Sequence, residues 1–144
     1  MLVKQGNYKS EYSPIFSKEI IGDNSEEILG LIPMMEKEFD RVEKIIGTEL
    51  KPEAAYYYYD FYDLAHFIKL KLQKFPQHER VEMEQAKAKL NFGVDLFESL
   101  NWVELWKLLL LTVQIDQVDH GFLEKKIKDK TILKLLKAIK NSFR

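Results

Sequence analysis

Hydrophobic residues recur at intervals of three and four positions along most of the chain, a pattern typical of helices with one buried face. The pattern begins near residue 24. Residues 1–24 show no sustained period and are interrupted by Pro14, so they are predicted to form an N-terminal arm. Residues 25–144 are predicted to form a single helical domain, because one hydrophobic core usually serves a chain of about this length.

Three helices are predicted before residue 101. The first covers residues 25–47, and Pro33 is expected to kink or restart it. The second covers residues 52–74 and the third residues 76–100, and each opens with a proline, which suits a first helical position. The inward positions predicted for these helices are Ile28, Leu31, Ile32, Met35, Phe39, Val42, Ile46, Ala54, Tyr58, Phe61, Ala65, Ile68, Leu72, Val81 or Met83, Ala86, Leu90, Val94, Phe97 and Leu100.

The fourth predicted helix is the most apolar part of the chain. Asn101 followed by Glu104 is typical of a capping box, and the helix is expected to end at Gly121. It is apolar around most of its circumference, which predicts the central and most buried position. A short helical turn follows, and a fifth helix begins at Asp129 or Thr131. The inward positions of this last helix are Ile132, Leu135, Leu136, Ile139 and Phe143.

Short connections between four or five helices predict an all-α fold, an antiparallel helical bundle of four main helices plus an N-terminal helix or arm. A hydrophobic content of 46% with a net charge of −1 excludes a disordered chain. The lack of cysteine excludes disulfide scaffolds and thiolate sites. No stretch reaches the roughly 20 apolar residues of a membrane span. We therefore expect a cytoplasmic protein that does not bind membranes.

Catalytic motifs are missing from the sequence. It contains neither a glycine-rich nucleotide loop nor a Gly-x-Ser-x-Gly nucleophile elbow. The sequence therefore predicts no enzyme activity, no catalytic residue and no cofactor. One alternative is a metal-binding bundle, because Asp63 and His66, and likewise Asp116 to His120, resemble the acid-x-x-His elements of di-iron bundles. The lack of inward glutamates argues against it, and no metal ligand is assigned.

An aromatic run in the second predicted helix is the first candidate binding surface. Five tyrosines and one phenylalanine fall within residues 54–63. Helical spacing places Tyr58 and Tyr62 with the core stripe and leaves a second face on the back of the helix. The predicted partner-binding residues there are Tyr56, Tyr57, Asp60, Asp63 and Phe67. Tyrosine is enriched at interface hot spots, so this face predicts a protein partner, although burial inside the bundle is an equally weighted alternative.

Charge is divided unevenly along the chain. Residues 122–144 hold eight basic and two acidic residues, a net charge of +6, so the remainder carries −7. The spacing of the last helix aligns its basic residues in one ridge opposite the core stripe. The predicted contact residues in this ridge are Lys130, Lys134, Lys137 and Arg144. A solvated face without a binding role is the alternative.

These features predict a non-catalytic protein-protein interaction module: an adaptor, an assembly subunit or an immunity-type inhibitor. Its partner would be another protein or a second copy of the chain. In the second case, the basic residues 122–144 of one copy would contact the acidic remainder of the other. The main alternative is a nucleic-acid-binding accessory protein that uses only the last helix, because the rest of the chain is acidic. The residues predicted for that role are Lys126, Lys130, Lys134, Lys137 and Arg144.

Two short fragments resemble known families. Residues 72–80, which include Phe75-Pro76, resemble an inter-helix turn in accessory proteins of diversity-generating retroelements. Residues 118–130 are similar to a stretch of reverse transcriptases. This chain has an extra N-terminal helix and is far less basic than those accessory proteins, and the rest of a polymerase does not fit in its length, so the sequence assigns no family.

Overall fold

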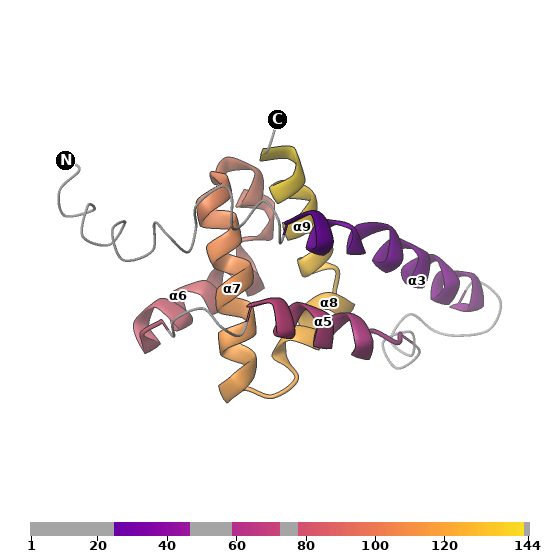
Figure 1. Cartoon of the computed structure of the whole chain (residues 1–144), viewed down its shortest axis with the longest axis horizontal. Helices are drawn as coiled ribbons and strands as arrows, with labels where there is room; N and C mark the ends of the chain where they lie inside the picture. The colour runs from indigo at the N-terminus through magenta and orange to yellow at the C-terminus, as the bar shows by residue number, and fades with distance from the viewer. Residues whose placement is uncertain (1–24, 47–58, 73–77, 143–144) are drawn as a thin grey trace.

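The computed structural model of the chain describes residues 25–46, 59–72 and 78–142, and every regular element within these ranges is a helix (Figure 1). A helical turn at residues 25–29 precedes the first of them. The elements are α3 (Leu31–Ile46), α5 (Tyr62–Leu72), α6 (Arg80–Phe92), the 3-10 helix η2 (Val94–Ser99), α7 (Trp102–Val118), α8 (Phe122–Lys128) and α9 (Thr131–Ser142). The predicted all-α fold is confirmed, and the packing of the helices agrees with a bundle.

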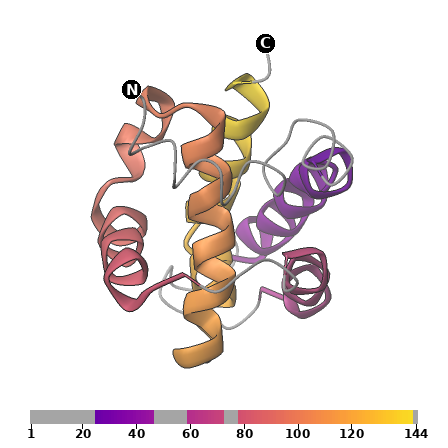
Figure 2. The ribbon, with the colours of Figure 1, turned by 60° about the vertical axis from the view of Figure 1, so that its left-hand side comes forward.

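Helix α7 is the centre of the molecule (Figure 2). It contacts α5, α6, α8 and α9, and its residues 108–116 form an unbroken run of buried positions. The predicted capping box opens it: Glu104 N–H donates to Asn101 Oδ1 at 2.9 Å, and Asn101 N–H donates to Glu104 Oε1 at 3.0 Å. The predicted central position of this helix is therefore confirmed, and a helix apolar on all sides needs neighbours on all sides.

The predicted third helix, residues 76–100, is wrong in two respects. Residues 78 and 79 are not helical, so α6 begins at Arg80, and the helix breaks at Gly93 and continues as η2. Glycine has low helix propensity, and the N–H of Leu96 donates to the Gly93 carbonyl in the tighter 3-10 pattern. Of the two inward candidates at the start of this helix, Val81 is 64% exposed and Met83 packs against the core. The inward positions Ala86, Leu90 and Phe97 are confirmed as buried.

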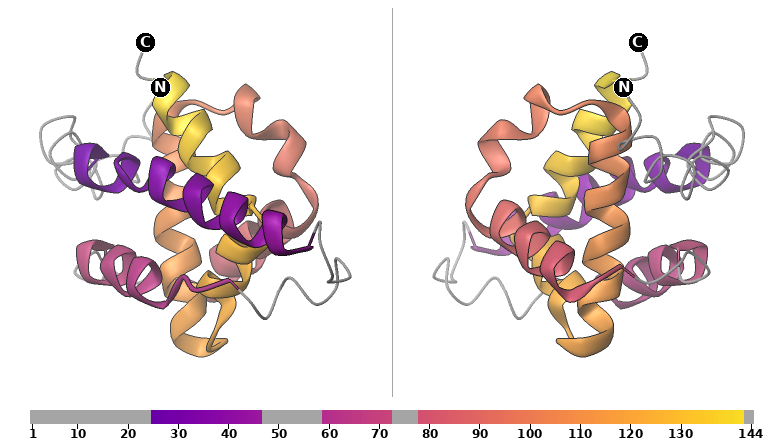
Figure 3. Two further views of the ribbon diagram at one scale, coloured as in Figure 1. Left: turned by 90° about the vertical axis from the view of Figure 1, so that its right-hand side faces the viewer. Right: turned by 90° about the vertical axis from the view of Figure 1, so that its left-hand side faces the viewer.

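Helix α3 restarts after a turn at Gly30, and Pro33 lies in its first turn, as predicted. Its buried face consists of the expected residues, Leu31, Ile32, Met35, Phe39 and Val42. The main packing partner of α3 is α9, which it crosses at an angle (Figure 3). Helix α5 lies below α3 in the same view and packs on α7 and α8.

The predicted second helix, from Pro52 to Lys74, is wrong at residues 59–61, which are not helical. Phe61 is 2% exposed, and its ring centroid lies 5.1 Å from Phe39 and 5.7 Å from Tyr59. This aromatic cluster fixes the chain in an irregular conformation just before α5, so the helix begins at Tyr62. Aromatic residues have low helix propensity, and here tertiary contacts decide the local structure.

Candidate interaction site

The outward side of α5 carries exposed aromatic and apolar side chains. We define the α5 outer face by six residues, Tyr62, Asp63, His66, Phe67, Leu70 and Lys71. Tyr62 is 68% exposed and Leu70 is 51% exposed, whereas Phe67 is half-buried. The Tyr62 and His66 rings are parallel, with their centroids 6.4 Å apart. The opposite side of the helix is fully used in the core, through Leu64, Ala65, Ile68 and Leu72.

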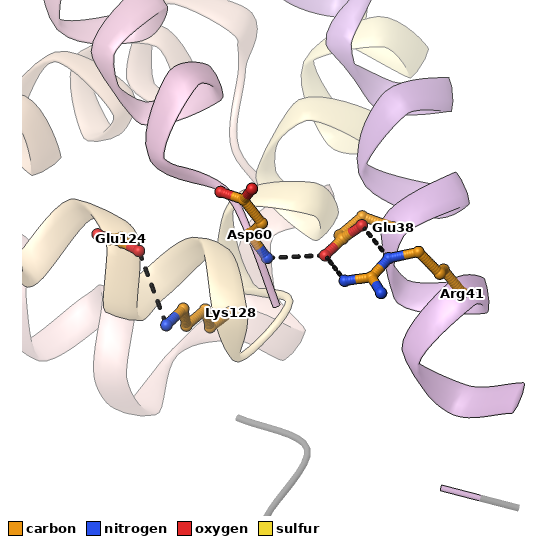
Figure 4. A network of polar contacts seen from close by, with 5 residues as sticks. All are labelled: Glu38, Arg41, Asp60, Glu124 and Lys128. Carbon is orange, nitrogen blue, oxygen red and sulfur yellow. Dashed lines mark hydrogen bonds and ion pairs between the residues drawn. The ribbon is translucent and has the colours of Figure 1, made fainter. Parts of the chain in front are cut away.

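A hydrogen-bond network from α3 fixes the chain at the start of α5 (Figure 4). Glu38 accepts two hydrogen bonds from the Arg41 guanidinium, at 2.8 and 2.7 Å, and a third from the backbone N–H of Asp60 at 2.7 Å. The Arg41 hydrogen bond is the largest cause that lowers the pKa of Glu38; burial opposes it and the Asp60 N–H supports it. A charge-assisted bond to a backbone N–H is a strong positional constraint. Asp60 is therefore held by its backbone, and its carboxylate is exposed.

A buried carboxylate on α7 holds α5 against the core. Asp116 is 5% exposed, and its Oδ2 lies 2.9 Å from Lys69 Nζ of α5. Its Oδ1 accepts hydrogen bonds from the backbone N–H groups of Gly121 and Leu123, at 3.1 and 3.0 Å. One side chain thus ties α5 to the end of α7 and to the beginning of α8. The α5 outer face is therefore presented on a rigid support.

The structure places the predicted aromatic anchor differently from the sequence. Tyr56 and Tyr57 lie outside the described residues. Asp60 precedes α5, so helical spacing does not align it with the others; only Asp63 and Phe67 share the outward side of the helix.

The assignment of Tyr62 to the core stripe is wrong. The core stripe of the helix is set by Ala65, Ile68 and Leu72, and Tyr62 is turned about 100° away from that direction. Helical phase measured from these three residues alone would have placed Tyr62 outside. The spacing argument failed because it was carried across residues 59–61, which are not helical.

Two lysines of the predicted basic ridge are paired within the chain, and one of them, Lys130, lies just before α9 with a backbone φ of 72°. Lys130 Nζ lies 3.1 Å from Glu43 Oε2, and Lys137 Nζ lies 2.8 Å from Glu36 Oε2, so both lysines bridge to α3. Lys134 lies between them and is exposed, without an ion pair to any residue that the structure describes. Arg144 lies outside the described residues.

Acidic residues border this ridge on both sides. A cleft of about 390 Å³ separates it from α3, and a second of about 310 Å³ separates it from η2. The acidic residues that line these clefts are Glu36, Asp40, Glu43, Asp95 and Glu98. The ridge is therefore part of a mixed-charge surface. Lys126, predicted for phosphate contact, is 5% exposed and pairs with Asp129 at 3.0 Å, so the prediction that it lies on an accessible basic face is wrong.

The cleft between α6 and the end of α7, about 620 Å³, has no uniform chemical character. Its wall combines basic, acidic and apolar groups, and Lys87 and Asp119 pair across it at 3.3 Å. The structure does not bring the residues of the metal alternative together: His66 is exposed on α5, His120 is exposed in the turn between α7 and α8, and Asp116 is committed to the contacts above. Within the described ranges, no three His, Asp or Glu side chains gather closely enough to hold a metal ion.

Comparison with known proteins identifies no relative. The chain matches no protein-family model, no curated protein and no solved structure. Among the helices that the structure describes, none combines the length and the apolar character needed to cross a lipid bilayer. The evidence for function therefore comes from the surfaces of the molecule itself.

Proposed function

We propose that the protein is a non-catalytic protein-protein interaction module, an adaptor, assembly subunit or immunity-type inhibitor, and that it binds its partner through the α5 outer face. One observation carries this proposal. Tyr62 and Leu70 are 68% and 51% exposed on the same side of a helix that also carries the half-buried Phe67. Exposed apolar side chains grouped on one face, with charged residues at the border, are typical of protein interfaces.

The support beneath this face favours binding. The Glu38 hydrogen bond to Asp60 N–H and the Lys69–Asp116 ion pair hold both the start and the middle of α5. A surface that is rigid before binding loses little conformational freedom in the complex, and aromatic anchors on such surfaces contribute most of the affinity. The proposed role of Lys134 is secondary: it is the one described lysine of the α9 ridge available to steer an acidic partner. The predicted cytoplasmic setting is part of this proposal.

Nucleic-acid binding through α9 is the less supported alternative. Lys130 and Lys137 are already paired with α3, and acidic side chains line the clefts on either side of the ridge. Binding to phosphates would weaken steeply with rising salt, whereas an apolar interface would weaken little. Titration of the purified protein with fluorescent DNA and RNA at low and high salt separates the two.

The experiment that tests the proposal is affinity capture from the native source, followed by mass measurement of the intact complex. The double variant Tyr62→Ala/Leu70→Ala is expected to lose the captured protein while keeping its helical circular dichroism. The matched control is Phe92→Ala, which removes an 88% exposed aromatic side chain at the end of α6. Capture that survives the α5 double variant, or that is lost only in the control, contradicts the proposal.

A further inference from the structure

The α5 outer face is self-complementary, and we propose that it binds the α5 outer face of a second copy of the chain in an antiparallel, two-fold symmetric pair. This inference rests on the proposed function and names the partner.

The six residues of the α5 outer face form two rows. Residues four apart lie one above the other on a helix, so Tyr62, His66 and Leu70 form one row. Asp63, Phe67 and Lys71 form the neighbouring row. The first row consists of aromatic and apolar side chains, and the second has one aromatic ring between opposite charges at its two ends. The midpoints of the two rows are residues 66 and 67, which are adjacent. A single two-fold axis that passes beside these residues therefore relates both rows to the same rows of a second copy.

An antiparallel pair about that axis brings unlike groups together. Tyr62 of one copy lies against Leu70 of the other, and Asp63 of one copy lies near Lys71 of the other, with each contact made twice. A parallel two-fold pair would instead place the first row of one copy against the second row of the other, and Asp63 would not meet Lys71. Only the antiparallel pair brings the opposite charges together, so charge selects the antiparallel orientation.

Asp63 is free to make this contact, whereas Lys71 would share its ammonium between Glu27 and the second copy. Asp63 is exposed and forms no ion pair with any residue in the described part of the chain. The Lys71 ammonium pairs with Glu27 at 2.8 Å and lies 5.3 Å from the centroid of the Phe67 ring, which brings it to the outer face. Exposed acidic and basic groups at opposite ends, with aromatic rings between them, resemble the polar rim and apolar centre of an interface.

The size of the face sets the strength of the pair. A single helix against a single helix falls at the small end of protein interfaces, below about 1,200 Å². We therefore expect a weak and reversible dimer whose population depends on protein concentration. Met34 on α3 lies one helical turn before Glu38 and is 58% exposed, so the neighbouring helix also carries exposed apolar surface.

Analytical ultracentrifugation of the full chain over a series of protein concentrations tests the inference. The wild type is expected to shift from monomer to dimer as concentration rises. Asp63→Lys and Lys71→Asp are each expected to weaken dimerisation roughly tenfold, because attraction becomes repulsion at two symmetric positions. The double variant Asp63→Lys/Lys71→Asp, made together with Glu27→Gln so that no like-charge pair forms within the chain, restores opposite charges across the two-fold axis and is expected to recover most of the affinity.

Three controls accompany the charge exchange. Glu27→Gln removes the ion pair of Lys71 without changing the outer face, so it is expected to leave dimerisation intact. Leu70→Asp is expected to abolish the dimer, and Phe92→Asp, at an exposed site on α6, is expected to leave it unchanged. Circular dichroism of every variant confirms that the fold is retained.

A wild type that stays monomeric at every concentration overturns the inference. A dimer that Leu70→Asp leaves intact overturns it as well, and failure of the double variant to recover overturns the antiparallel arrangement. These outcomes differ from failure of the proposed function. If the protein is always monomeric but loses a captured partner in Tyr62→Ala/Leu70→Ala, the partner is a different protein and the proposed function stands.

Discussion

Lys137 Nζ of α9 lies 2.8 Å from Glu36 Oε2 of α3, so the basic helix near the end of the chain is paired with an acidic helix near its beginning. A second pair, Lys130 with Glu43, repeats the contact at 3.1 Å. Part of the positive charge near the end of the sequence is therefore neutralised within the molecule by acidic residues of α3. A charged stretch that appears available in the sequence is, in the fold, a contact between helices.

Charge exchange across α3 and α9 measures this contact. Glu36→Lys and Lys137→Glu are each expected to lower the free energy of unfolding by about 0.5–1 kcal/mol, because each side chain is half exposed and solvent weakens the pair. The double exchange is expected to restore most of the loss. Urea denaturation of the four proteins gives the coupling free energy directly. A coupling near zero would show that the pair contributes nothing to the packing of α3 on α9.

Asp116 is expected to be far more important for stability than its neighbour Asp119. Asp116→Ala removes a buried carboxylate that pairs with Lys69 and accepts two backbone N–H groups, and should cost about 2–4 kcal/mol of unfolding free energy. Asp119→Ala removes a partner of Lys87 whose side chain is 51% exposed, and should cost less than about 1 kcal/mol. Chemical denaturation compares them, and equal losses would contradict the assigned role of Asp116.

The network around Glu38 predicts a contribution to stability that depends on pH. The pKa of Glu38 is lowered in the folded state, chiefly by the Arg41 hydrogen bond, so the unfolded chain binds the proton more tightly. The contribution is fully present above the ordinary glutamate pKa of about 4.3 and is lost as the pH falls through the lower folded-state value. Its size should be about 1 kcal/mol or less.

Glu38→Gln is therefore expected to make the free energy of unfolding less dependent on pH below about 4.5. Near neutrality, the slope of that free energy against pH should be the same as in the wild type. Glu98→Gln, at an exposed glutamate of η2, is the control and should leave the wild-type pH profile unchanged. Urea titrations at a series of pH values make the comparison. A Glu38→Gln profile parallel to that of the wild type would rule out the linkage.

Gly121 connects α7 to α8 with a backbone φ of 93°, in the left-handed region. No atom lies within 4 Å of the position that a Cβ would take, so a substitution there meets strain in the backbone and no steric clash. Gly121→Ala is expected to cost about 1 kcal/mol, and Gly121→Asn less, because asparagine tolerates this conformation better. Thermal denaturation should rank the three proteins in the order Gly, Asn, Ala; an alanine variant as stable as the wild type would contradict the strain argument.

The sequence predicted those features that depend on nearby residues. The partners in the Asn101–Glu104 capping box are three positions apart, and the burial of α7 follows from its own composition, so both were found. The break at residues 59–61 depends on Glu38, 22 positions earlier, and on packing against Phe39. No local pattern carries that information. The pairing of Lys130 with Glu43 joins residues 87 positions apart and was missed for the same reason.

For the candidate site too, features set by nearby residues were predicted and features set by distant residues were not. Helical spacing counted from Tyr56 and Asp60 placed Asp63 and Phe67 on an outward face, and in α5 Asp63 is exposed and Phe67 half-buried. Tyr62 was assigned to the core because the spacing was extended across the start of the helix. The element containing the site was therefore predictable, whereas the exact start of α5, which decides which tyrosine is exposed, was not.

The central place of α7 has a consequence for the synthesis of the chain. Translation proceeds from the N-terminus. Each earlier helix packs mainly on a later one: α3 packs on α9, α6 packs on α7, and α5 packs on α7 and α8. The apolar faces of the earlier helices thus emerge from the ribosome before the surfaces that cover them exist. Folding of the described helices must wait until α7 to α9 have left the ribosomal tunnel. A nascent chain arrested before residue 102 is therefore expected to expose those faces and to be a ready substrate for chaperones and proteases.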